Sequence, residues 1–182
     1  MIFIGLGANL PTERFGPPRA ALGAALHMLA EEGVRTVRRS PWYESAPVPM
    51  SDDPWYVNGV AEIETEFPPL RLVGKLLEIE ARVGRVRSIA NAPRVLDLDL
   101  IAYNQQVLSD VADDGTRAIV PHPRMTDRAF VLFPLSDLSP GWQHPQNHIP
   151  MQQMIASLPD GQMTRLLPDA NGYKGTEWQV RT

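Results

Sequence analysis

Two aspartates interrupt an otherwise apolar run and limit how that run can fold. The run extends from Val95 to Ile101, and the acids are Asp97 and Asp99. On a strand, alternate side chains share a face, so the leucines between the acids predict one buried face and the carboxylates the opposite one. Two such acids indicate either a polar edge strand or a cation site. Because oxygen ligands without cysteine favour Mg²⁺, the second interpretation predicts a magnesium site that also takes phosphate ligands.

An arginine-rich segment directly precedes this strand. Between positions 82 and 94 the chain carries four arginines and no acid, although its formal net charge is −4. Each guanidinium can hold two phosphate oxygens, so the cluster favours a polyphosphate ligand over the alternative, a solvated basic loop. Gly84 and Pro93 predict a loop in much of this segment. The four arginines are Arg82, Arg85, Arg87 and Arg94.

Composition limits the class of protein. The chain has 182 residues, of which 43% are hydrophobic, and this predicts one domain. Cysteine is absent, which excludes a disulfide framework and a thiolate metal site. No apolar run reaches membrane-spanning length, and the acidic balance argues against a nucleic-acid binder. We therefore expect a cytoplasmic monomer with no membrane or nucleic-acid partner.

The order of the predicted strands and helices indicates an α+β fold. Strands are predicted where apolar residues alternate or run together, and helices where prolines precede apolar residues at helical spacing. The resulting order, βαββαβ, is that of the ferredoxin-like fold, an antiparallel sheet with both helices on one face. The other face of such a sheet is left for a ligand. The predicted strands are residues 1–6, 34–43, 57–67 and 95–103, and the predicted helices are 17–33 and 68–84.

The chain beyond residue 104 is predicted to extend the same domain. A short hairpin follows the fourth strand, and then a turn at residues 121–124 leads into a helix through 127–138. The last fifteen or so residues contain proline, asparagine and two glycines, which indicate a loosely ordered tail. No linker or repeat divides the chain.

Six short motifs are spread along the chain. They are Gly5–Leu10, Ser40–Pro47, Tyr56–Asn58, Gly84–Arg87, Pro93–Leu100 and Val120–Pro123. Together they resemble the 6-hydroxymethyl-7,8-dihydropterin pyrophosphokinase family over roughly residues 1 to 160, and Pro93–Leu100 is the most specific of them. The resemblance thus implies one domain over residues 1–160, with residues 161–182 as its C-terminal extension. The resemblance implies an enzyme of folate biosynthesis that uses ATP as co-substrate and two Mg²⁺. Such an enzyme transfers the β,γ-pyrophosphoryl group to the pterin hydroxymethyl oxygen and releases AMP.

The resemblance assigns roles to residues on the phosphate side of the site. Asp97 and Asp99 would hold both metals, and Arg85 and Arg94 would clamp the developing charge. In metal-templated phosphoryl transfer, positioning and charge neutralisation supply most of the catalysis. The other ATP contacts that the resemblance implies are Glu80, Arg87, Leu100, Arg117, His122 and Arg128.

The resemblance also assigns a pterin site. A flat heterocycle is best held between two aromatic rings, and the nominated rings are Tyr56 and Phe130. Core packing is the alternative for both rings, but Asn58 shares the predicted strand face of Tyr56, which favours a site. The Asn58 amide suits the amide-like edge of a pterin. Backbone contacts are implied for Ser45, Ala46 and Val48.

The chain departs from the family pattern in the loop before the Pro-Arg motif. An arginine-tryptophan pair is expected there, and the chain has Ala90 and Asn91, which predicts weaker closure over ATP. Alternative functions are a catalytically weak pterin- or nucleotide-binding paralogue and a kinase for a related pterin. A nucleotidyltransferase is a further alternative, but such an enzyme would need a glycine-serine pair to hold the triphosphate, and residues 84–94 contain none. Other departures are Pro123, Pro49 and Leu77.

Overall fold

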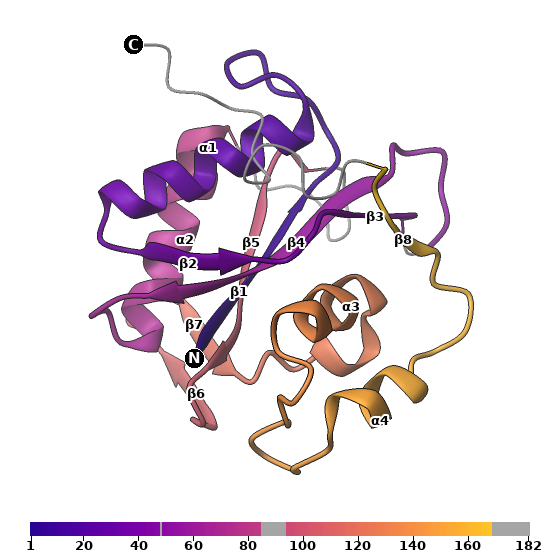
Figure 1. The fold of residues 1–182 in the computed structure, drawn as a ribbon. Helices are drawn as coiled ribbons and strands as arrows, with labels where there is room; N and C mark the ends of the chain where they lie inside the picture. Colours follow the sequence, from indigo (N-terminus) through magenta and orange to yellow (C-terminus); the bar gives the residue numbers. More distant parts are fainter. Residues whose placement is uncertain (48, 85–93, 169–182) are drawn as a thin grey trace.

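The computed structural model describes residues 1–47, 49–84 and 94–168. In these ranges the chain forms an antiparallel sheet with helices on both faces, and a separate hairpin (Figure 1). The strands are β1 (Ile2–Ala8), β2 (Arg35–Arg39), β3 (Tyr43–Ser45), β4 (Tyr56–Glu64), β5 (Asp97–Tyr103), β6 (Leu108–Val111), β7 (Arg117–Val120) and β8 (Thr164–Leu166). The helices are α1 (Pro18–Glu31), α2 (Pro69–Val83), α3 (Ala129–Leu138), α4 (Met151–Ala156) and the 3-10 turn η1 (Met125–Asp127).

The predicted α+β class with an antiparallel sheet and helices is confirmed. The sheet runs in the order β5-β1-β4-β3-β8, with β2 also paired to β4, and the hairpin is β6 with β7. The helix predicted to end at Gly84 does so, because this glycine adopts φ 111° and closes α2 in the left-handed region. Neither α4 nor β8 was predicted, because neither short segment carries a clear period.

The second strand, predicted over residues 34–43, ends earlier than expected: β2 stops at Arg39, and a separate strand, β3, begins at Tyr43. The residues between them, Ser40 to Trp42, include Pro41, which has no N–H to donate to a neighbouring strand. The indole of Trp42 is completely buried and lies over Gly59 of β4. A Cβ at position 59 would come within 2.8 Å of that ring, so only glycine leaves room for the tryptophan.

The sheet has a hydrophobic core on each face. Helices α1 and α2 cover one face, where Ile4, Leu6 and Leu98 are buried. Helices α3 and α4 cover part of the other face, over Phe3 and Val60 (Figure 1). The prediction left this second face to a ligand, and the structure corrects it: only one end of the face is uncovered.

The register between β1 and β5 sets the geometry of the uncovered end. Gly5 stands opposite Asp99, and Gly7 opposite Asp97. An irregularity between Phe3 and Ile4 shifts the pairing beyond this point. The two acids therefore lie beside two residues without side chains. None of the helices in the described parts of the chain is long and apolar enough to cross a membrane.

Candidate active site

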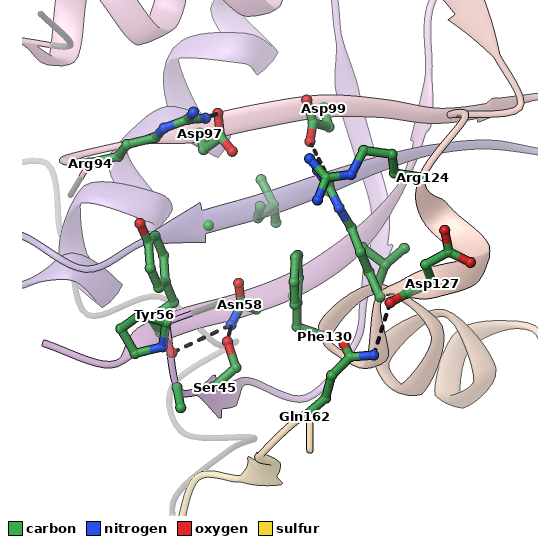
Figure 2. Close-up of a pocket in the computed structure, with 18 of the residues that line it drawn as sticks. Ser45, Tyr56, Asn58, Arg94, Asp97, Asp99, Arg124, Asp127, Phe130 and Gln162 are labelled. Atoms are coloured by element: carbon green, nitrogen blue, oxygen red, sulfur yellow. Dashed lines mark hydrogen bonds and ion pairs between the residues drawn. The ribbon is translucent and has the colours of Figure 1, made fainter. Parts of the chain in front are cut away.

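A pocket of about 590 Å³ lies at the uncovered end of the sheet (Figure 2). Pockets that hold small molecules usually have volumes of about 300 to 1,000 Å³, so this one has room for a ligand of that size. Its walls come from β1, β4 and β5, from the start of α3 and from the segment after α4. The polar and aromatic residues in its lining are Ser45, Ser51, Asp53, Tyr56, Asn58, Arg94, Asp97, Asp99, Arg124, Asp127, Arg128, Phe130, Asp160 and Gln162.

The two aspartates of β5 line this pocket, on the face opposite the α1 and α2 core. The side chains of Asp97 and Asp99 are 27% and 37% exposed, respectively. A Cβ at Gly5 would lie 3.8 Å from that of Asp99, and one at Gly7 would lie 3.9 Å from that of Asp97. An added Cβ at either position would thus make ordinary van der Waals contact with the aspartate Cβ, and the glycines leave the surface beside the two acids open.

Arg94 is held in place by an ion pair with Asp97 and by hydrogen bonds between its backbone and Asn9. Its Nη1 lies 2.5 Å from Oδ1 of Asp97. The backbone N–H of Arg94 donates to Oδ1 of the buried Asn9, and the Asn9 amide donates to the carbonyl of Pro54. Burial lowers the pKa of Arg94, but the neighbouring Asp97 carboxylate outweighs burial and raises that pKa above its usual value. Arg94 is therefore a fixed positive charge.

Asp99 lies beside a second group of basic side chains. Its Oδ2 is 3.4 Å from Nη1 of Arg128 and 3.9 Å from Nε2 of His122. Burial lowers the pKa of His122, and the charges of Arg128 and Arg124 add to this effect while Asp99 opposes it. The backbone N–H of Arg124 donates to Nδ1 of His122, so the neutral ring carries its proton on Nε2, the nitrogen nearer Asp99.

The opposite wall of the pocket carries an amide between two aromatic rings. Figure 2 shows Asn58 between the rings of Tyr56 and Phe130. The Asn58 Nδ2 donates to Ser45 Oγ at 2.8 Å. Its Oδ1 faces Gly7, where an added Cβ would approach it to 3.4 Å. Burial raises the pKa of the Tyr56 hydroxyl, which keeps it protonated.

The chain matches one known protein family over most of its length. Residues 3–140 match the model of 7,8-dihydro-6-hydroxymethylpterin-pyrophosphokinase, abbreviated HPPK. This match spans more than half of the chain. The chain belongs to the HPPK family. The family predicted from the six motifs is thereby confirmed, as is the predicted activity, pyrophosphoryl transfer from ATP in folate biosynthesis.

Curated relatives support the HPPK assignment. The 2-amino-4-hydroxy-6-hydroxymethyldihydropteridine pyrophosphokinase of Pseudomonas aeruginosa is 39% identical over 91% of this chain and 96% of its own length. The Haemophilus influenzae enzyme of the same name is 35% identical over 91% of this chain and 98% of its own. Folic acid synthesis protein fol1 of Schizosaccharomyces pombe is 35% identical, but this chain spans only 20% of it.

Solved structures show the same fold. A Plasmodium falciparum HPPK-DHPS chain, wild type, superposes with a TM-score of 0.65 at 12% identity. The match covers 85% of this chain and 44% of that one, so this HPPK chain spans less than half of the HPPK-DHPS protein. At this identity the likeness concerns the fold alone.

Four described residues that were predicted to contact ATP are not among those that line the pocket. One of them is His122, which lies beside the pocket residue Asp99. Leu100 packs in the core with α1 and α2, on the face opposite the acids. Glu80 is 1% exposed, and its Oε1 accepts the backbone N–H of Leu98 at 2.7 Å, so it supports β5 from beneath. Arg117 lies on the exposed face of β7. Five residues singled out from the sequence lie outside the described ranges: Val48, Arg85, Arg87, Ala90 and Asn91.

The pocket also contains residues that the sequence analysis did not nominate. Arg124 is the clearest of them, and its position two residues after the motif histidine could have suggested it. Asp127 and Gln162 carried no comparable signal in the sequence. Gln162 reaches the pocket from a segment after α4 that belongs to none of the motifs. These additions make the HPPK pocket more polar than the sequence alone suggested.

Proposed function

We propose that this pocket holds ATP and 6-hydroxymethyl-7,8-dihydropterin together, with the phosphates beside the acids and the pterin beside the aromatic rings. The observation that carries the proposal is that both kinds of wall line one pocket. Asp97 and Asp99 lie on one side, and Tyr56, Asn58 and Phe130 on the other (Figure 2). A substrate hydroxymethyl group would then face the phosphates, as transfer between bound substrates requires.

Asp97 and Asp99 are the proposed ligands of two Mg²⁺. Their carboxylates fit that role, because both face the pocket across a surface that Gly5 and Gly7 leave clear. In the described residues, histidine, cysteine and acidic side chains form no group of three or more suited to a metal. Phosphate oxygens and water would therefore supply the other ligands, as is usual for Mg²⁺. Bound Mg²⁺ supplies charge neutralisation and alignment of the triphosphate.

Arg94, Arg128 and His122 are the proposed phosphate contacts. A guanidinium has five N–H donors, so Arg94 and Arg128 can pair with their aspartates and still bind phosphate oxygens. His122 would act as a neutral Nε2–H donor, since burial disfavours its charged form. These fixed donors are expected to stabilise the charge that develops on the leaving AMP and the transferred group. Arg85, assigned to the same clamp from the sequence, remains part of the proposal.

The proposed pterin contacts are stacking on Tyr56 and Phe130 and hydrogen bonds to Asn58. The Asn58 Nδ2 is used by Ser45, which fixes the amide orientation and turns its Oδ1 toward Gly7. An oxygen held in this way can accept hydrogen bonds from the N–H groups of a pterin. It does not suit a ring whose edge toward Asn58 carries only hydrogen-bond acceptors. This polarity is our reason to propose a 2-amino-4-oxo pterin as the substrate.

We infer a ferredoxin-like sheet whose second strand is interrupted, in a single domain that includes the C-terminal extension. Support comes from the element order β1-α1-β2/β3-β4-α2-β5 and from the strand order β5-β1-β4-β3. Support for the single domain comes from β8, which lies beyond residue 160 and pairs with β3. In this arrangement the two central strands, β1 and β4, both carry residues of the site.

The test is to incubate the full chain with ATP, Mg²⁺ and 6-hydroxymethyl-7,8-dihydropterin and to separate the nucleotides by chromatography. We expect AMP in equal amount to the pterin diphosphate, and no AMP with a pterin that lacks the hydroxymethyl group. ADP in place of AMP would indicate a simple kinase. Binding of both substrates without turnover would indicate a catalytically weak paralogue, and either result would contradict the proposal.

A further inference from the structure

The segment that follows α4 returns to the pocket and contacts the start of α3. We call Pro159–Leu166 the return segment; its central residue is Gln162, which is half-buried and lines the pocket (Figure 2). The Gln162 Oε1 accepts the backbone N–H of Ala129 at 2.9 Å. Its Nε2 donates to the backbone carbonyl of Asp127, also at 2.9 Å. Both ends of one amide are thus bonded to the backbone on either side of Arg128.

These bonds fix the point where α3 begins. The first N–H groups of a helix have no partner within the helix and need one from elsewhere. Arg128, the N-cap, makes no side-chain hydrogen bond of that kind, because a guanidinium has no acceptor atom, and its side chain pairs with Asp99 instead. Gln162 provides the partner from 33 residues away. The helix start therefore depends on the return segment, and Phe130 is in the first turn of that helix.

The return segment is also attached to the opposite side of the pocket. Its β8 strand pairs with β3, in the register Ser45 with Thr164, and the N–H of Ala46 donates to the carbonyl of Met163 at 3.0 Å. Arg165 pairs with Glu44 at 2.6 Å. One short segment therefore connects the β3 end, which carries Ser45, with the α3 start, which carries Phe130.

We propose that Gln162 is a positioning residue for pterin binding, which sets Phe130 at the correct distance from the wall formed by Asn58 and Ser45. This inference rests on the proposed pterin site. Loss of the Gln162 hydrogen bonds should weaken the binding of the pterin more than the binding of ATP. Arg128 is held by its ion pair with Asp99 as well as by the backbone, whereas the Phe130 ring is placed by the helix start and by the Arg128 guanidinium, 5.5 Å from the ring centroid.

The test compares Gln162→Met, which keeps the side-chain length but removes the hydrogen bonds to Ala129, Asp127 and Pro159, with Gln162→Glu, which keeps the acceptor for Ala129. Gln152→Met, at an exposed position on α4, is the matched control. The measurements on the full chain are the pterin Kd by calorimetry with a non-hydrolysable ATP analogue and Mg²⁺, the KM values, kcat and the Tm.

For Gln162→Met we expect the pterin Kd and KM to rise about tenfold, the size of effect that follows the loss of one or two hydrogen bonds. The KM for ATP should stay within about twofold, a change worth less than the loss of one hydrogen bond. Gln162→Glu should lie between wild type and Gln162→Met, and Gln152→Met should match wild type.

Two results would overturn the inference. One is a lower Tm in Gln162→Met with pterin Kd and KM unchanged, which would make Gln162 a helix cap alone. The other is an equal rise in the KM values for ATP and pterin. A wild-type chain that fails to bind the pterin would instead refute the proposed pterin site, and with it this inference, whatever the variants do.

Discussion

The two ends of one sheet face are built from the same three strands and yet serve different purposes. At one end Phe3, Val60 and Ile101 are buried against α3 and α4 and form a hydrophobic core. At the other end the same alternation of β1, β4 and β5 presents a different set of residues to the pocket. They are Gly5, Gly7, Tyr56, Asn58, Asp97 and Asp99.

The difference shows that side-chain identity, and not strand order, divides core from site. Glycines and carboxylates offer a helix no apolar surface to pack on. Helices α3 and α4 therefore bury only the end of the sheet face that carries apolar side chains. The change from core residue to pocket residue occurs between consecutive residues on the same face of a strand, for example between Ile101 and Asp99 of β5. Substitutions at the pocket end should therefore lower activity, and substitutions at the covered end should lower the free energy of unfolding.

The largest expected effect is on catalysis at the open end. Asp99→Asn keeps the shape of the side chain and removes its charge, so kcat should fall about a hundred- to a thousandfold. The free energy of unfolding should change by less than about 1 kcal/mol, since the carboxylate is more than a third exposed. Steady-state AMP formation and urea unfolding measure the two quantities. The control is Asp110→Asn, on an exposed part of β6. Near-normal turnover in Asp99→Asn would refute the proposed role of Asp99 as a metal ligand.

The next effect is on stability at the covered end. Leu135→Ala removes a completely buried side chain of α3, and such a change costs about 2–5 kcal/mol. Urea unfolding measures the loss, and the KM values of the folded fraction should stay close to wild type. The exposed Val111→Ala serves as control. A loss below about 1 kcal/mol would mean that the covered end is not the well-packed core described above.

A smaller effect is expected where the two walls meet. Gly7→Val places a branched side chain between Asp97 and Asn58, where even a Cβ would lie 3.4 Å from the Asn58 Oδ1. The value of kcat/KM for the pterin should fall about tenfold, which corresponds to about 1.4 kcal/mol of crowding. Gly74→Val, in open space on α2, should leave kinetics unchanged. Unchanged kinetics in Gly7→Val would mean that the ligand does not use this surface.

The sequence predicts best the parts that depend on local period. The two-residue alternation placed Asp97 and Asp99 together on one face, and it also places Leu100 on the other face, as the structure does. The resemblance assigned Leu100 to ATP despite that alternation. The break in the second strand could have been inferred from Pro41, which cannot donate a ladder hydrogen bond.

Residues that reach the pocket through tertiary docking could not be predicted in this way. Gln162 lies far along the chain from the residues it bonds, and the short β8 that follows has no clear alternation. The cover of α3 over one end of the sheet also depends on long-range packing of Phe3 and Val60. No local pattern in the sequence encodes either contact.

The most direct test of the account is to count the metal ions that the open end binds. Mn²⁺ replaces Mg²⁺ in an electron paramagnetic resonance titration of the full chain, with a non-hydrolysable ATP analogue and 6-hydroxymethyl-7,8-dihydropterin present. We expect two Mn²⁺ per wild-type chain, as two-metal phosphoryl-transfer sites require, and fewer in the combined Asp97→Asn, Asp99→Asn variant. Two ions retained in that variant, or a single ion in the wild type, would contradict the proposed two-metal site.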